Sequence, residues 1–242
     1  MDEAIREYRT AIELQRDYAQ AHCNRGAVLE RQGKFPEALA EWRIGHELGS
    51  KRPGWPHQSD AWVRRAEGLV RLDGKLVEIL QGKDNAANNS ERLQLAWLCQ
   101  QPFKKLYAAS ARFYGEAFDH DAKLADNMQQ QFRYNAACAA VLAGSGKGED
   151  AAKLDDKDQA RLRKQALDWL HADLDAWNKL LLGDPEKDRA LVQQTLEHWQ
   201  QDSELEGIRD PAALEKLPDA ERRACEKLWA AVGELLTRVK EK

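Results

Sequence analysis

The sequence predicts an all-α protein: an α-solenoid of antiparallel helix pairs, wound as a right-handed superhelix and closed by a helical cap at the carboxy terminus. Alanine, leucine, glutamate and arginine dominate the composition, and proline and glycine cluster at intervals. Runs of valine, isoleucine and threonine that alternate with polar residues, the mark of strands, are missing. The third observation is an internal repeat at an offset of about 34 residues. Ala4, Tyr8, Ala11 and Leu14 recur as Ala38, Trp42, Gly45 and Leu48.

Residues 19–50 carry one complete helix–turn–helix repeat. Gly26 and Ala38 are small enough for the two helices to cross closely, and Gly33 ends the first helix in a left-handed conformation. Trp42 then fills the space between the helices. This period with these residue types is the pattern of the tetratricopeptide (TPR) repeat, which the chain resembles. The resemblance implies a scaffold for protein–protein interaction.

Residues 2–16 are expected to form the second helix of a repeat whose first helix is absent. Its apolar residues Ile5, Tyr8 and Ile12 form a stripe that would normally pack against the missing helix. An uncapped end of a solenoid tends to pair with another chain, so a homodimer through this stripe is one alternative function.

Beyond residue 52 the repeat pattern weakens. We expect one continuous solenoid of three regions: residues 1–52 (a half repeat and a complete TPR), residues 53–128 (degenerate TPR-like helix pairs), and residues 129–242 (a TPR-like pair with an inserted loop, then capping helices). A polar stretch ends at Ser90, which is expected to cap the next helix. The further helices are expected over residues 58–72, 75–81, 91–101, 106–119, 131–143, 160–182 and 218–240, with one more opening at Asp184-Pro185 and a short one after Arg209.

Charge and cysteine patterns exclude several classes of function. The formal net charge is −4 with both signs interspersed, so no basic face for nucleic acid is expected. The four cysteines form no CxxC pair and the six histidines no ligand pair one helical turn apart, so we expect no metal site and no cofactor. No apolar run approaches the ~20 residues that span a bilayer. Together these features predict a cytoplasmic protein without membrane insertion.

The inner face of the solenoid, lined by first helices, is the candidate binding groove. Asn24 and Asn135 match an asparagine with which many peptide-binding TPR repeats hold a ligand backbone. Arg31 and Arg64 could meet a carboxylate. The two lysines of repeats that clamp acidic carboxy-terminal peptides are missing, and an ordinary solvated helix surface is the competing interpretation of these residues. The candidate groove residues are Gln20, Asn24, Ala27, Arg31, Arg64 and Asn135, with Cys23 also expected on this face.

Five short motifs carry a second resemblance. They are Arg133 to Ala140, Arg163 to Leu170, His198 to Asp202, Arg209 to Ala212, and Leu228-Trp229. From Asp2 through the last helix, the chain resembles the carboxy-terminal TPR region of large bacterial serine/threonine protein kinases. That resemblance implies a partner-binding or regulatory region of a kinase-linked protein.

No kinase catalytic motif is present, because a Gly-rich loop after a strand, Val-Ala-Ile-Lys, His-Arg-Asp and Asp-Phe-Gly are all missing. We therefore predict a scaffold that is not an enzyme, has no catalytic residues, and binds a protein or peptide.

Overall fold

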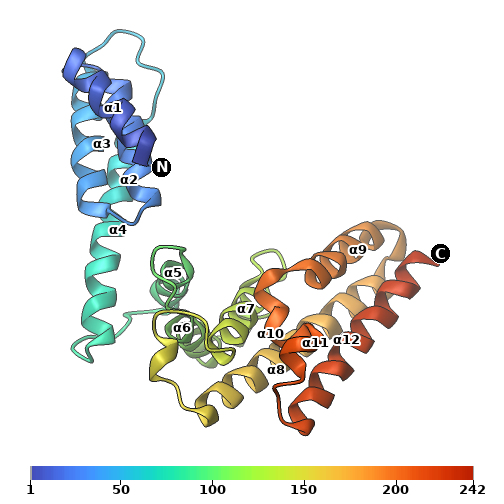
Figure 1. Cartoon of the computed structure of the whole chain (residues 1–242). Helices are drawn as coiled ribbons and strands as arrows, with labels where there is room; N and C mark the ends of the chain where they lie inside the picture. The colour runs from blue at the N-terminus through green and yellow to red at the C-terminus, as the bar shows by residue number, and fades with distance from the viewer. Residues whose placement is uncertain (1, 242) are drawn as a thin grey trace. The chain divides into compact units, whose positions relative to one another are not determined.

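The computed structural model describes residues 2–241, which form twelve α-helices and three short 3-10 helices and contain no strand. The predicted all-α fold class is confirmed. The chain folds as two compact units (Figure 1): unit 1 ends at Ala86, inside the predicted region 53–128, and unit 2 begins at Ala87. Within residues 2–241, no helix has the length and apolarity needed to cross a membrane.

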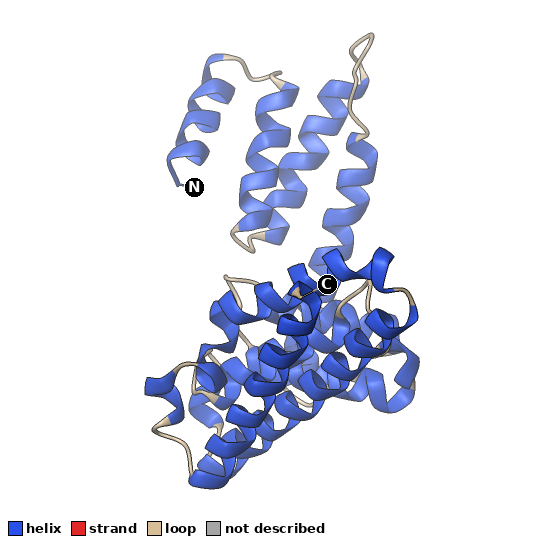
Figure 2. Cartoon of the chain, turned by 90° about the vertical axis from the view of Figure 1, so that its right-hand side faces the viewer, coloured by secondary structure: helices blue, strands red, loops and turns tan. Residues whose placement is uncertain are grey.

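Unit 1 is a run of antiparallel helices, each joined to the next by a short connection (Figure 2). The tight turn between the second and third helices contains Gly33, whose φ of 75° is left-handed. The next amide, of Lys34, donates back to the Leu29 carbonyl at 3.0 Å, which is the bond that closes a helix in a Schellman motif. The helices are α1 (Asp2–Leu14), α2 (Ala19–Arg31), α3 (Phe35–Ser50) and α4 (Ser59–Leu80).

Small residues allow α2 and α3 to approach closely, as the repeat pattern predicts. A Cβ atom at Gly26 would lie 1.7 Å from Cδ1 of Trp42, and one at Gly45 would lie 2.5 Å from Sγ of Cys23. Each glycine therefore creates the space that a side chain of the opposite helix occupies. Cys23 is only 3% exposed as a result, so the expectation that it faces a groove is wrong.

The predicted break between helices 58–72 and 75–81 does not exist, because α4 runs without interruption. Leu69, Leu72, Leu76 and Ile79 are all buried and recur at helical spacing across the expected break. Gly74 lies inside this helix at a cost of about 1 kcal/mol relative to alanine. Burying one leucine side chain contributes about 1.5–3 kcal/mol, so the apolar stripe outweighs the glycine.

Unit 2 is built around a helix with almost no exposed surface. The buried residues of α7 include every position from Ala136 to Gly144, so neighbouring helices cover it on all sides. α5 and α6 form one helix pair, and α7 and α8 form the next. The α-helices are α5 (Asn89–Gln100), α6 (Tyr107–His120), α7 (Phe132–Gly144), α8 (Asp156–Gly183), α9 (Pro185–Gln201), α10 (Glu206–Arg209), α11 (Pro211–Leu214) and α12 (Asp219–Lys240). The 3-10 helices are η1 (Ala122–Leu124), η2 (Ala151–Lys153) and η3 (Ser203–Leu205).

Side-chain caps decide where two helices of unit 2 begin. Asn88, and not the expected Ser90, caps α5, because its Oδ1 accepts from the Glu91 amide at 3.0 Å. Asp155 accepts from the Asp158 amide at 2.8 Å, so α8 starts before the expected residue 160. Each cap satisfies an amide that the first helical turn leaves without a partner.

The motifs of the kinase-like resemblance hold the end of unit 2 together. Arg163 donates from Nε to Glu221 at 2.7 Å and from Nη1 to the carbonyl of Gly144, which ties α8 to α12 and to the end of α7. Trp229 donates from Nε1 to the carbonyl of Ile208 at 2.8 Å, which ties α12 to α10. These residues therefore have a packing role.

Candidate partner-binding surface

Four of the six predicted groove residues share one side of α2. Gln20, Asn24, Ala27 and Arg31 are spaced i, i+4, i+7 and i+11, so their side chains form one stripe, here called the α2 stripe. Arg31 is exposed and the other three are partly exposed. The buried residues of α2, among them Leu29, point to the other sides of the helix. The α2 stripe is therefore partly exposed along its length and exposed at Arg31.

Two polar side chains of the α2 stripe have hydrogen-bonding groups that are available to a ligand. Gln20 donates from Nε2 to Oδ1 of Asn24 at 2.8 Å, which orients the Asn24 amide. No acceptor for the Asn24 amide nitrogen is found within residues 2–241, so two N–H donors remain. Arg31 has no acidic partner within residues 2–241, so its guanidinium can bind a carboxylate of a ligand.

Arg64 lies on α4. Its neighbour Arg65 has Nη2 2.8 Å from Glu30 Oε1, so this part of α4 lies near the end of α2 that carries Arg31. That Arg64 shares a binding surface with Arg31 stays a prediction. Arg64 itself pairs with Asp60 at 2.8 Å on its own helix and is exposed. An exposed pair of this kind contributes about 0.3–0.5 kcal/mol, so a ligand carboxylate can compete for Arg64.

Asn135 belongs to unit 2 and is not part of the α2 stripe. It lies on α7, where its carbonyl oxygen accepts from Gln100 Nε2 at 2.8 Å. Asn135 therefore contributes its main chain to the contact between α5 and α7. The prediction that it shares a groove with Asn24 stays a prediction.

A groove of about 340 Å³ lies between α1, α2 and α3, at residues that the sequence pattern did not single out. Its floor includes Arg25 and Leu29, which point to the side of α2 opposite the α2 stripe. Glu41 lines it and pairs with Arg25 at 3.0 Å and with His22 at 2.8 Å. No sequence signal marks the groove, because three separate helices supply its walls.

The predicted self-association stripe lies on α1, a helix that has no fully buried residue. Ile5, Tyr8 and Ile12 are each partly exposed, and Ile5 lines the groove between α1, α2 and α3. Apolar area on α1 therefore remains in contact with water.

Unit 2 contains a larger cleft of about 850 Å³ between the end of α7, the start of α8 and the α10–α11 segment. Arg163 and Glu221 lie in its wall as an ion pair, and Lys147 and Glu206 form a second pair at 3.4 Å. Because acidic and basic side chains are mixed, the cleft shows no preference for an anion or a cation.

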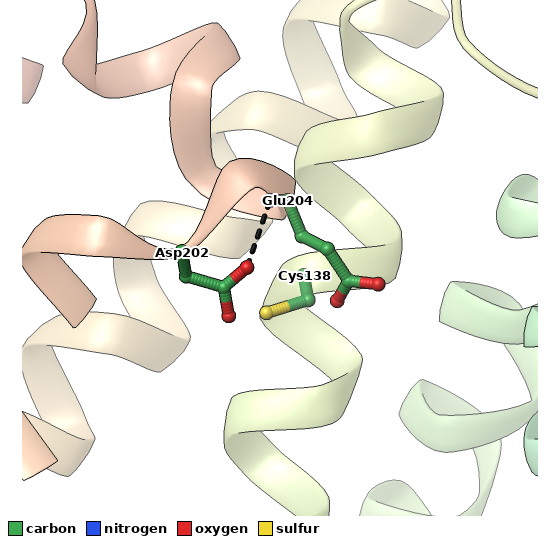
Figure 3. A group of neighbouring side chains, drawn as sticks. All are labelled: Cys138, Asp202 and Glu204. Carbon is green, nitrogen blue, oxygen red and sulfur yellow. Dashed lines mark hydrogen bonds between the residues drawn. The ribbon is translucent and has the colours of Figure 1, made fainter. Parts of the chain in front are cut away.

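One group of metal-ligating side chains occurs within residues 2–241, although the sequence predicted none. Cys138 from α7 meets Asp202 and Glu204 from the segment that follows α9 (Figure 3). Burial raises the pKa of the Cys138 thiol, and the nearby Glu204 and Asp202 carboxylates raise it further. Burial also raises the pKa of the Glu204 carboxyl group. The group is distant from the α2 stripe in sequence and belongs to unit 2 alone.

Comparison with known proteins agrees with this architecture. A family model described as the TPR repeat matches residues 1–33, which contain α1 and α2. No curated protein and no solved structure matches the chain. The fold is an all-α helical repeat of the TPR type, and TPR repeats generally mediate interactions between proteins.

Proposed function

We propose that the chain is a non-catalytic scaffold that binds a peptide segment of another protein along the α2 stripe. The observation that carries this proposal is the partly exposed stripe itself, in which Asn24 keeps free amide donors and Arg31 lacks an acidic partner within the described residues. The Asn24 amide can donate to a backbone carbonyl of the peptide. Ala27 lies between Asn24 and Arg31 on the α2 stripe, and it is small enough to let the peptide backbone approach the helix.

Arg31 and Arg64 then select for an acidic residue in the peptide. Arginine binds a carboxylate through two parallel N–H···O bonds, and such charge-assisted bonds are about twice as strong as neutral ones. Charged groups at the rim of an interface also accelerate association and reject partners of like charge. Reversal of these charges should therefore affect binding more than loss of the side chains alone.

Charge reversal at both arginines tests the proposal. Peptides selected from a displayed library on the full chain serve as the probe. We expect the double variant Arg31→Glu/Arg64→Glu to raise their Kd at least ~10-fold, which corresponds to about 1.4 kcal/mol. Isothermal titration calorimetry measures the Kd.

The control variant is Arg161→Glu, which reverses an exposed charge on α8 in unit 2. It should bind the selected peptides as the wild type does. Equal affinities of the wild type and the double variant would rule out the α2 stripe as the binding site.

We further propose a link to a kinase, which rests on the resemblance of five short motifs to the TPR regions of bacterial serine/threonine kinases. The scaffold would then position a bacterial serine/threonine kinase or its substrates. The chain can be a region of a larger protein or a separate adaptor protein. An immunoblot of cell extract with an antibody against this chain distinguishes these two possibilities. A band far above the mass of the chain supports a region of a larger protein, and a band at its own mass supports a separate adaptor.

Self-association through α1 is the second candidate function. It is favoured by the partly exposed apolar residues Ile5, Tyr8 and Ile12 on a helix that buries none of its residues fully. Transfer of such area from water contributes about 25 cal/mol per Å², and two copies can bury it against each other.

If this interface forms, the variant Ile5→Asp/Tyr8→Asp should elute as a monomer under conditions in which the wild type is a dimer, because a carboxylate in the contact would lose its hydration. Size-exclusion chromatography with light scattering measures the mass. Glu7→Lys, an exposed position on α1, serves as the control and should leave the dimer intact. Identical masses for the wild type and the Ile5/Tyr8 variant would contradict this role.

A further inference from the structure

Side chains from two segments far apart in the sequence meet at one point in unit 2. Cys138 comes from the central helix α7, Asp202 ends α9, and Glu204 lies in η3. The ligand atoms, Sγ of Cys138 and one carboxylate oxygen of each acidic residue, all lie within 4.8 Å of one another. Figure 3 shows the Cys138 sulfur between the two carboxylates, on the side toward Asp202.

Neighbouring groups hold Asp202 in a fixed orientation. Tyr134 Oη donates to Asp202 Oδ2 at 2.6 Å, and the Glu204 amide donates to Asp202 Oδ1 at 2.8 Å. Arg209 donates from Nη1 to the Asp202 carbonyl at 2.6 Å, which fixes its main chain. Metal-binding carboxylates in proteins are typically oriented by outer hydrogen bonds of this kind.

The charges at this point are not balanced by a strong cation. In the part of the chain that the structure describes, neither Asp202 nor Glu204 forms an ion pair with lysine or arginine. His198 Nε2 lies 3.4 Å from Asp202 Oδ2, and the Arg209 guanidinium contacts the main-chain carbonyl of Asp202 and forms no ion pair with its carboxylate. Two carboxylates beside a thiol that is 1% exposed repel one another, and a divalent cation would remove that repulsion.

The ligand types select the metal. Thiolate and imidazole together with carboxylates suit Zn²⁺, which takes four ligands in a tetrahedron. Mg²⁺ and Ca²⁺ take oxygen ligands, so the buried sulfur argues against them. His198, one helical turn before Asp202, can supply a nitrogen, because its Nε2 lies 3.4 Å from Asp202 Oδ2 and its side chain is 62% exposed.

We propose that Cys138, Asp202, Glu204 and His198 form a Zn²⁺ site that joins α7 to the segment after α9. Both Glu204 and His198 are exposed, so the ion can enter from solvent while Cys138 closes the inner side. The site is separate from the α2 stripe, and its role is structural, because a bound ion stabilises the folded form that presents its ligands. The proposal does not depend on the proposed peptide binding.

Substitution by Co²⁺ tests the site, because a thiolate bound to tetrahedral Co²⁺ produces a sulfur-to-metal charge-transfer band in the near ultraviolet. The full chain is treated with a chelator and then titrated with Co²⁺ and afterwards with Zn²⁺. We expect the band to saturate at a stoichiometric amount of Co²⁺ and to disappear when Zn²⁺ displaces it. The absence of a charge-transfer band in the wild type would overturn the proposal.

Matched variants assign the ligands. Cys138→Ser should abolish the band, and Cys23→Ser, at a buried cysteine of unit 1 with no carboxylate among the causes of its raised pKa, should retain it. Glu204→Gln and His198→Ala change exposed residues, so these variants should fold and should each weaken Co²⁺ binding at least ~10-fold by analogy with the loss of supporting groups around metals. A band that persists in Cys138→Ser, or wild-type affinity in Glu204→Gln, would also overturn the proposal.

Discussion

Replacement of Gly26 by alanine is expected to destabilise unit 1 by about 3 kcal/mol, at the upper end of the range for overpacked cores. The added Cβ would lie 1.7 Å from Cδ1 and 1.9 Å from Nε1 of Trp42. Trp42 is buried and its ring meets that of Trp62 edge to face at 5.3 Å, so it cannot move aside without disturbing α4. The higher helix propensity of alanine than of glycine offsets only about 1 kcal/mol of this destabilisation.

Urea unfolding, combined with hydrogen exchange on peptides from unit 1, measures the effect. Gly68→Ala is the control, because Gly68 is also within a helix but a Cβ added there would have no atom within 4 Å among the described residues. That change should be neutral or stabilise unit 1 by up to about 1 kcal/mol. Equal effects at Gly26 and Gly68 would show that the close approach of α2 and α3 is not present.

A second substitution separates crowding from helix propensity. With Trp42→Leu in the background, Gly26→Ala should cost less than it does alone, because the smaller side chain leaves room for the methyl group. Strict additivity of the two changes would contradict the contact between Gly26 and Trp42.

Replacement of Trp199 by alanine is expected to destabilise unit 2 by about 3–5 kcal/mol, the range for removing a large aromatic side chain from a core. Trp199 is 1% exposed and belongs to the same apolar core as Leu196 and Leu228. Its ring stacks on Tyr134 at 5.4 Å, and Tyr134 in turn donates to Asp202. The cavity left by the indole would therefore remove packing and loosen the segment after α9.

Trp97→Ala is the control, because Trp97 is 43% exposed on α5 and the same atoms are deleted. Its cost should stay below about 1 kcal/mol. The free energy of unfolding in urea and the near-ultraviolet circular dichroism of unit 2 measure both variants. Similar losses for Trp97 and Trp199 would contradict the core position of Trp199.

The sequence was sufficient for features that depend on neighbouring residues. The spacing of Gly26, Gly33, Ala38 and Trp42 predicts the α2–α3 hairpin, because each residue type meets a local steric demand. Asp184 before Pro185 predicts the start of α9 for the same reason, and Asp184 accepts from the Lys187 amide at 3.3 Å. The predicted helix boundaries were less accurate where two local sequence signals compete.

The tertiary structure decided which surfaces are covered and which distant residues meet. The continuity of α4 depends on the burial of Leu72 and Leu76, and this burial outweighs the local preference of Gly74 for a break. The position of Cys23 under Gly45 and the meeting of Cys138 with Glu204 likewise depend on packing between helices. Local residue patterns determine helices and turns through short-range sterics and hydrogen bonds, whereas burial and long-range contacts are set by how the finished helices pack.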